Sequence, residues 1–184
     1  IVTDQHVPYP ADLANLPAGT VFPQIQGSPG AFCCAVTQEG EIYCWGENTD
    51  GQLGDASTVT KYLPVKVDMS GLNVGEVFSE VSVNQYHTCA LTSQNRAFCW
   101  GDDSLLELGN GAILTVDQSS PSLVDTSNLG LGEYFVTLGG GYAFSCGTSN
   151  LNKVYCWGEG GAGQLGAGGA VATPFITHHN ALNL

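Results

Sequence analysis

The stretch CAVTQEGEIYCWGENTDGQLG, residues 34–54, carries the pattern that decides the fold. A cysteine is followed ten positions later by Cys-Trp-Gly and then by a Leu-Gly pair, and the pattern recurs from Cys89 and from Cys146. The three copies begin 55 and 57 residues apart. Because a fixed period of this size is typical of one supersecondary unit stacked on itself, we predict a repeat protein. Its repeat-defining structural residues are Trp45, Trp100, Trp157, Gly54, Gly109 and Gly166.

The centre of each cysteine pair indicates a β-hairpin. In the first copy, a three-residue loop at 38–40 would be closed by Thr37 and Glu41, and its third position needs a left-handed backbone. Glycine and asparagine tolerate that conformation best. The residues at this third position are Gly40, Asn95 and Asn152. All three copies therefore fit the same tight hairpin.

Such a hairpin places the two cysteines of each copy opposite each other in a non-hydrogen-bonded pair, with about 4.5 Å between their Cα atoms. This spacing suits a disulfide, whereas zinc ligands would stand about two to four residues apart with a second pair nearby. We therefore predict three disulfides, and buried free thiols are the alternative. The predicted pairs are Cys34–Cys44, Cys89–Cys99 and Cys146–Cys156. The remaining Cys33 should point to the opposite face, as a free buried thiol or as a bond to another chain.

Two further segments complete each repeat. A short segment with a central phenylalanine precedes each hairpin, weakened in the first copy by Pro23, and a proline-led segment follows the Leu-Gly pair. The first copy also carries one extra residue before its hairpin, either Cys33 or a loop residue near 27–30. Four short antiparallel strands per unit of about 50 residues is the content of a β-propeller blade. We predict an all-β fold of three blades, forming a partial or intermolecularly completed propeller. The predicted boundaries are 1–18 for a spare strand or arm that resembles the fourth segment of a blade, then 19–74, 75–131 and 132–184 for the blades.

Three motifs resemble a known family. The Cys-Ala-Leu-Thr segment from Cys89, the Cys-Trp-Gly triplet from Cys99 and the Gly-Gln-Leu-Gly turn from Gly51 resemble the repeat of the regulator of chromosome condensation, above all its cysteine-bearing, secreted versions. The resemblance covers nearly the whole chain and implies a β-propeller used mostly as a binding scaffold. The name-giving member is a nuclear exchange factor for a small GTPase, but that activity belongs to loops without a match here. The second copy departs from the pattern, with Leu106-Glu107 in place of Gly-Gln.

Composition limits the partners and the compartment. Seventeen acidic and four basic residues give the 184-residue chain a net charge of −13, which repels phosphate backbones and disfavours nucleic acid. No apolar run approaches the roughly 20 residues of a membrane span. Seven cysteines indicate an oxidising compartment, so we expect a secreted, extracellular or cell-surface protein. The start at Ile1 is typical of a processed chain or of one read in part.

The sequence shows no catalytic set, and we expect no metal or cofactor. His87 lies just before a repeat cysteine, where a structural role is expected, and the adjacent pair His178-His179 is the alternative metal ligand. The segments 47–51 and 102–103 carry oxygen ligands without the alternation and bidentate glutamate of a calcium loop. Each tryptophan stands at a repeat-defining position, which favours packing over stacking on a sugar.

The sequence thus predicts a secreted, non-enzymatic structural or protein-binding scaffold that associates with itself into an oligomer or filament. Three blades do not close a ring, because propellers usually have about four to eight. The spare arm could add as a strand to the last blade of a neighbouring copy. A module that recognises carbohydrate or another protein at its loop tips is the alternative. Guanine-nucleotide exchange is a third hypothesis, but it would need a polar pocket that the sequence does not indicate.

Overall fold

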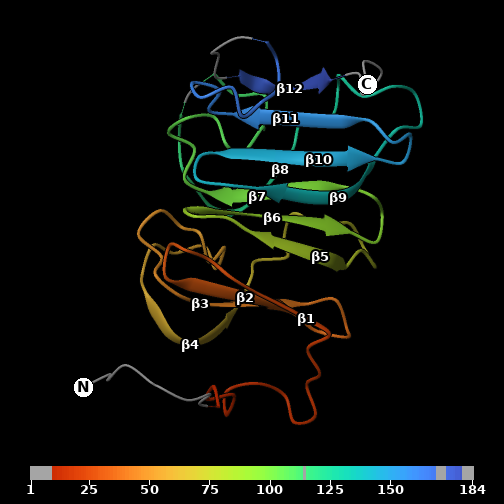
Figure 1. Cartoon of the computed structure of the whole chain (residues 1–184). Helices are drawn as coiled ribbons and strands as arrows, with labels where there is room; N and C mark the ends of the chain where they lie inside the picture. The colour runs from red at the N-terminus through yellow and green to blue at the C-terminus, as the bar shows by residue number, and fades with distance from the viewer. Residues whose placement is uncertain (1–9, 114, 169–172, 180–184) are drawn as a thin grey trace.

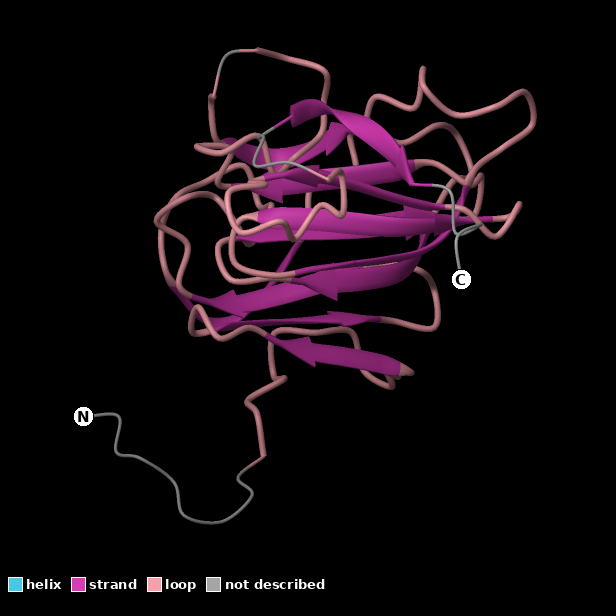
Figure 2. Ribbon diagram, turned by 45° about the horizontal axis from the view of Figure 1, so that its top comes forward, coloured by secondary structure: helices cyan, strands magenta, loops and turns pink. Residues whose placement is uncertain are grey.

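The computed structural model describes residues 10–113, 115–168 and 173–179, which form strands and turns without a helix (Figure 2). Twelve strands make three antiparallel four-stranded sheets, stacked in chain order (Figure 1). We call them blade 1, blade 2 and blade 3. Blade 1 contains β1 (Gln24–Gly27), β2 (Phe32–Val36), β3 (Ile42–Gly46) and β4 (Lys61–Lys66). Blade 2 contains β5 (Phe78–Val83), β6 (His87–Thr92), β7 (Ala97–Gly101) and β8 (Gln118–Leu123). Blade 3 contains β9 (Phe135–Gly140), β10 (Phe144–Ser149), β11 (Val154–Gly158) and β12 (Thr173–His179). The all-β prediction is confirmed, and the described part holds no helix that is long and apolar enough for a bilayer.

The middle two strands of each blade form the predicted hairpin. The Thr37 nitrogen donates to the Glu41 carbonyl at 2.8 Å and closes the three-residue loop. The third loop residue is left-handed in every copy, with φ of 77° at Gly40, 60° at Asn95 and 57° at Asn152. The two cysteines of each predicted disulfide, which we call the staple cysteines, stand directly opposite each other in all three registers. The hairpin geometry expected from the cysteine spacing is therefore the observed one.

The Trp-Gly step interrupts the pairing between the third and fourth strands of every blade. In blade 1 the register shifts between Cys44 and Gly46, and blades 2 and 3 shift at the equivalent place. Glycine is required here, because φ is 111° at Gly46 and a Cβ would lie 2.4 Å from the Ala31 carbonyl oxygen. This bulge turns the strand out toward the loop that carries the Leu-Gly pair.

Prolines lie within or just before outer strands of the sheets. The fourth strand is an edge strand in each sheet and contains a proline, which an edge tolerates because the missing N–H removes no inner ladder bond. These prolines are Pro64, Pro121 and Pro174. In blade 1, Pro23 also delays the first strand, so β1 has four residues whereas β5 and β9 have six and begin at a phenylalanine.

Both faces of the sheets are used for packing, because strand side chains alternate between the two sides. We call the side with the disulfide the disulfide face and the opposite side the tryptophan face. The disulfide face of blade 1, with Cys34 and Ile42, packs against the tryptophan face of blade 2, with Phe78, Phe98 and Trp100. The disulfide face of blade 2 packs in the same way against blade 3. The hydrophobic core therefore lies between blades.

The described part of the predicted arm is a turn. A backbone hydrogen bond of 3.0 Å closes the turn at 13–16, and the same bond occurs in the links between blades at 69–72 and 126–129. Residues 10–20 thus enter blade 1 as the later links enter blades 2 and 3. Residues 1–9 of the arm lie outside the described residues. All three sheets already hold four strands, so an added arm would find no vacant fourth position in them.

We predict that the double variant Cys89→Ala/Cys99→Ala loses about 2 to 4 kcal/mol of unfolding free energy, because the unfolded chain gains the freedom that the closed loop removed. Urea denaturation under non-reducing conditions measures the loss. Cys33→Ala is the matched control, since it removes a thiol without opening a loop. Equal stability of the double variant and the control would contradict the prediction.

Candidate functional site

The three disulfides lie on the faces through which blades meet. The Cα atoms of each pair are 4.1 Å apart. At the two internal junctions the neighbouring blade covers the sulfur pair, so Cys34 and Cys89 are fully buried. On blade 3, no further blade of the described part packs on this face, and Cys146 is partly exposed. The disulfides therefore staple the hairpins and also form part of the surface between blades.

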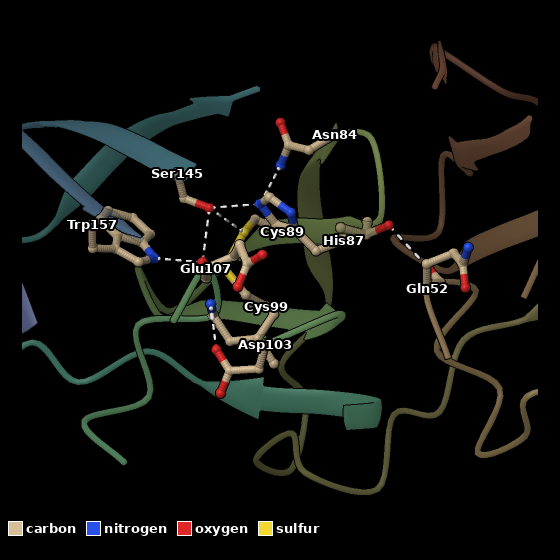
Figure 3. The surroundings of a disulfide bond; sticks show 11 residues. Gln52, Asn84, His87, Cys89, Cys99, Asp103, Glu107, Ser145 and Trp157 are labelled. Atoms are coloured by element: carbon tan, nitrogen blue, oxygen red, sulfur yellow. Dashed lines mark hydrogen bonds between the residues drawn. A yellow bond between two sulfur atoms is a disulfide. The ribbon is translucent and has the colours of Figure 1, made fainter. Parts of the chain in front are cut away.

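Each internal junction is centred on a tryptophan that packs under a turn of the preceding blade, and Figure 3 shows Trp157 at the turn that carries Glu107. The Trp100 Nε1 donates to the Gln52 carbonyl at 3.0 Å, and the Trp157 Nε1 donates to the Glu107 carbonyl at 2.8 Å. Both rings are fully buried. A buried indole needs a partner for its N–H, and the turn supplies one.

The glycine of the Leu-Gly pair makes room for the ring. A Cβ on Gly54 would lie 2.6 Å from the Trp100 Nε1, and a Cβ on Gly109 would lie 2.5 Å from the Trp157 Nε1. Both glycines are left-handed, with φ of 71° and 60°. The tryptophan of one repeat therefore meets the Leu-Gly pair of the repeat before it. The recurrence of these residues predicts a structural role for them, but it does not indicate that the contact joins successive copies.

A hydroxyl beside each buried tryptophan reaches the same carbonyl. Thr88 Oγ1 donates to the Gln52 carbonyl at 2.9 Å, and Ser145 Oγ donates to the Glu107 carbonyl at 3.0 Å. Each hydroxyl directly precedes the first staple cysteine of its copy. An alignment of the three copies by that cysteine would have drawn attention to this position.

Cys33 occupies this hydroxyl position in blade 1. It pairs with Trp45 in the register in which Thr88 pairs with Trp100. Cys33 therefore has an equivalent in each of the other copies and is not the extra residue of blade 1. That residue lies in the loop at 28–31. The thiol is free and partly exposed, and its burial raises the pKa of Cys33. A raised pKa keeps the thiol neutral, which lowers its reactivity.

The departure of the second copy from the Gly-Gln pattern leaves the turn conformation unchanged. Leu106 has φ of 70°, compared with 80° at Gly51 and 81° at Gly163. A side chain in this region costs about 1 to 2 kcal/mol, and the surrounding turn holds it there.

Blade 2 carries a carboxylic acid where blades 1 and 3 carry an amide. Glu107 stands at the position of Gln52 and Gln164, and its Oε2 accepts the same backbone hydrogen bond, at 2.8 Å. Its Oε1 is buried without a hydrogen-bond partner among the described residues. Burial raises the pKa of Glu107 to about 8, and the charges of Asp102 and Asp103 act in the same direction. Glu107 is therefore a carboxyl group that the fold favours in its protonated form.

Two more titratable groups are buried near this junction. Asp103 stands where blade 1 has Asn48, and burial raises the pKa of Asp103 to about 6. His87 Nε2 lies 2.8 Å from Ser145 Oγ and 3.0 Å from Asn84 Nδ2, so the ring links blade 2 to blade 3 (Figure 3). Burial lowers the pKa of His87 to about 4, which keeps the ring neutral. These contacts give His87 a structural role, as expected from the sequence.

The other positions considered for ligands do not converge in the described part of the chain. No group of three or more His, Cys, Asp or Glu side chains there is arranged to hold a metal ion, including those at 47–51 and 102–103. The side chains of His178 and His179 lie outside the described residues.

The repeat has a known counterpart. The model of the Regulator of chromosome condensation (RCC1) repeat matches residues 39–91, and a second model of that description matches residues 78–105. The chain belongs to the RCC1 repeat family.

One relative and two solved structures show what the chain is similar to. The human E3 ubiquitin-protein ligase HERC2 is 30% identical over 144 residues, which is 78% of this chain and 3% of HERC2. The crystal structure of human WBSCR16 matches with a TM-score of 0.75 and 21% identity, over 88% of this chain and 40% of that chain. Prp20p from Saccharomyces cerevisiae matches with a TM-score of 0.68 and 20% identity, over 85% of this chain and 38% of that chain. The described repeats have the fold of the two solved structures, and the chain spans less than half the length of each of the three proteins.

We predict that the three repeat tryptophans differ in their contribution to stability. Trp100→Ala and Trp157→Ala each remove a fully buried ring and its hydrogen bond, so the unfolding free energy should fall by about 3 to 5 kcal/mol. Trp45→Ala should cost about 1 kcal/mol or less, because that ring is partly exposed. Urea unfolding followed by far-UV circular dichroism at low protein concentration measures all three. Equal losses at the three positions would be inconsistent with the junction geometry.

We predict that Glu107→Gln stabilises the protein at high pH. The folded-state pKa of Glu107 is raised, so its contribution is fully present below its usual pKa of 4.5 and is lost as the pH rises through about 8. Glutamine keeps the backbone hydrogen bond and cannot ionise, so the variant should gain about 1 to 3 kcal/mol over the wild type at pH 8. Urea unfolding at pH 5 and pH 8 measures the change. Glu39→Gln, in an exposed loop, is the control, and an equal gain there would refute the assignment.

Proposed function

We propose that the protein is a secreted, non-enzymatic scaffold that binds proteins through its blade faces and associates with copies of itself. One observation carries this proposal: the faces that bury the core inside the chain are open at both ends of the described stack. On blade 1, Ile25 is 63% exposed and Trp45 is partly exposed. On blade 3, Val154 is 37% exposed and Cys146 is partly exposed. Apolar surface of this kind favours association.

The cysteine chemistry supports the secreted location. Three disulfides would be reduced in the cytosol and persist in an oxidising compartment. The described residues hold no membrane-spanning helix, which is compatible with an extracellular protein. The net charge of −13 favours solubility there.

The buried polar groups support a scaffold without catalysis. Ser145 and the ring of His87 link two blades, and the carboxyl of Glu107 accepts a backbone hydrogen bond. None of these three residues lines the hollow on blade 3 or the hollows beside Thr20 and beside Tyr134. Among the similar proteins, HERC2 is an E3 ubiquitin-protein ligase, and Prp20p binds Gsp1p and histones. Because this chain spans small parts of both, we carry over only protein binding.

A recognition module is the second candidate, and an aromatic pair favours it. The rings of Tyr86 and Tyr142 meet edge to face at 5.5 Å on neighbouring loops, and Tyr142 is 57% exposed. Exposed aromatic rings of this kind stack on sugars and on peptide side chains. A glycan array probed with the wild type and with Tyr142→Ala separates this candidate from the scaffold.

We predict that the purified 184-residue chain associates with itself. Its mass in sedimentation velocity should rise with protein concentration, and electron micrographs should show assemblies. Apolar blade ends should associate more strongly at high salt, because salt screens the repulsion between copies of charge −13. A monodisperse monomer at high concentration and high salt would contradict the self-association.

A further inference from the structure

The two ends of the described stack carry the two halves of one junction. The turn at 163–166 of blade 3 repeats the turn that receives Trp100 in blade 1. Its φ angles are 81° at Gly163 and 69° at Gly166, against 80° and 71° at the equivalent glycines of blade 1. A backbone hydrogen bond of 2.9 Å closes both turns. The turn of blade 3 therefore has the backbone conformation of the turn that covers Trp100, although no described tryptophan lies under it.

Blade 1 presents the matching tryptophan in the geometry of the buried ones. Gly46, directly after Trp45, has φ of 111°, against 108° and 98° after the two buried tryptophans. The Glu47 nitrogen donates to the Ala31 carbonyl at 3.1 Å, and the equivalent bond in blade 2 measures 3.0 Å. The Trp45 ring is nevertheless partly exposed, because no described turn covers it.

The surfaces beside these two features are also complementary. The disulfide face of blade 3 has a hollow of about 220 Å³, lined among others by Gly139, Cys146 and Val154. Ile25 of blade 1 is 63% exposed, whereas the equivalent Val81 of blade 2 is fully buried against the disulfide face of blade 1. A blade docked on blade 3 as blade 2 docks on blade 1 would bring Ile25 to this hollow.

We propose that the tryptophan face of blade 1 docks on the disulfide face of blade 3 of a second copy, with Trp45 under the turn at 163–166. The proposal rests on the self-association proposed above and names its surfaces. The two junctions inside the chain are the argument for this occupant, because the same residue types in the same positions already form them. A head-to-tail contact of this kind closes into a ring or propagates as a filament.

Cys33 lies in this contact as a weak donor. The hydroxyls of Thr88 and Ser145 bond the carbonyl of the turn at the internal junctions. In the proposed contact the Cys33 thiol faces the Gln164 carbonyl of the second copy, and a thiol donates more weakly than a hydroxyl. The contact between copies is thus weaker at this point than the junctions within one chain.

Two single variants each remove one half of the contact. Trp45→Ala removes the ring and keeps the turn, whereas Gly166→Ala fills the space for the ring and keeps Trp45. Gly168→Ala is the matched control: it has the same left-handed backbone, with φ of 73°, and blade 1 has Ala56 there with φ of 60°. Sedimentation velocity and circular dichroism follow association and folding.

Each variant alone should associate on the order of 100-fold more weakly than the wild type, since a buried tryptophan is an interface hot spot. An equimolar mixture of the two should form a dimer and stop there. The intact Trp45 of the Gly166→Ala chain can dock on the intact turn of the Trp45→Ala chain, and no second junction can form. The Gly168→Ala control should associate as the wild type does.

The outcomes separate this contact from self-association in general. If the wild type associates but the mixture does not form a dimer, the head-to-tail contact is wrong and self-association stands. The same conclusion follows if either variant associates as tightly as the wild type. A monomeric wild type overturns both and leaves another protein, or a further blade of a longer chain, as the occupant. Should Trp45→Ala not fold, Trp45→Phe replaces it, because it keeps an apolar ring without the Nε1 donor.

Cys33→Ser tests the contact by strengthening it. The serine hydroxyl reproduces the donor of Ser145, so the association constant should rise by about threefold to tenfold. A loss of association in Cys33→Ser would show that a disulfide between copies, and not the tryptophan contact, holds them together.

Discussion

The indole of Trp100 under the Gln52 carbonyl is the contact on which the stacked arrangement depends. It needs three features at once: a bulge that turns the ring outward, a left-handed glycine that leaves room for it, and a backbone carbonyl of the turn that accepts the indole N–H. The same set recurs at Trp157. A single sheet cannot supply all three, because ring and turn belong to different blades. Each blade is therefore stabilised by its neighbour, as in other repeat proteins.

The disulfides and the junctions stabilise the fold by different means. Each staple acts mainly on the unfolded chain, by closing a short loop whose ends are ten residues apart. The junctions act on the folded chain, by removing apolar surface from water. Because the sulfur pairs also lie on the buried face, reduction would loosen the hairpin and disturb the surface that meets the next blade. This coupling fits a protein that works in an oxidising compartment.

The two internal junctions share a geometry but differ in chemistry. Between blades 1 and 2 the turn carries Gln52, whereas between blades 2 and 3 it carries Glu107, with His87 and Ser145 alongside. Burial disfavours the ionised form of Glu107, whereas Gln52 cannot ionise, so we expect the second junction to lose stability as the pH rises. The two solved structures share the fold that contains both junctions, and the side chains at this turn distinguish one blade of this chain from another.

The repeat, the hairpins, the disulfide pairs and the four-stranded blades could be predicted from the sequence alone, because they depend on spacings within about twenty residues and on local turn chemistry. It also marked the tryptophans and the Leu-Gly pairs. Three facts required the three-dimensional structure: Trp100 contacts Gly54 of the preceding copy, Cys33 occupies the position of a hydroxyl, and Glu107 is buried. These facts depend on how one sheet lies on the next. Contacts between blades join residues some fifty positions apart, and no local pattern encodes them.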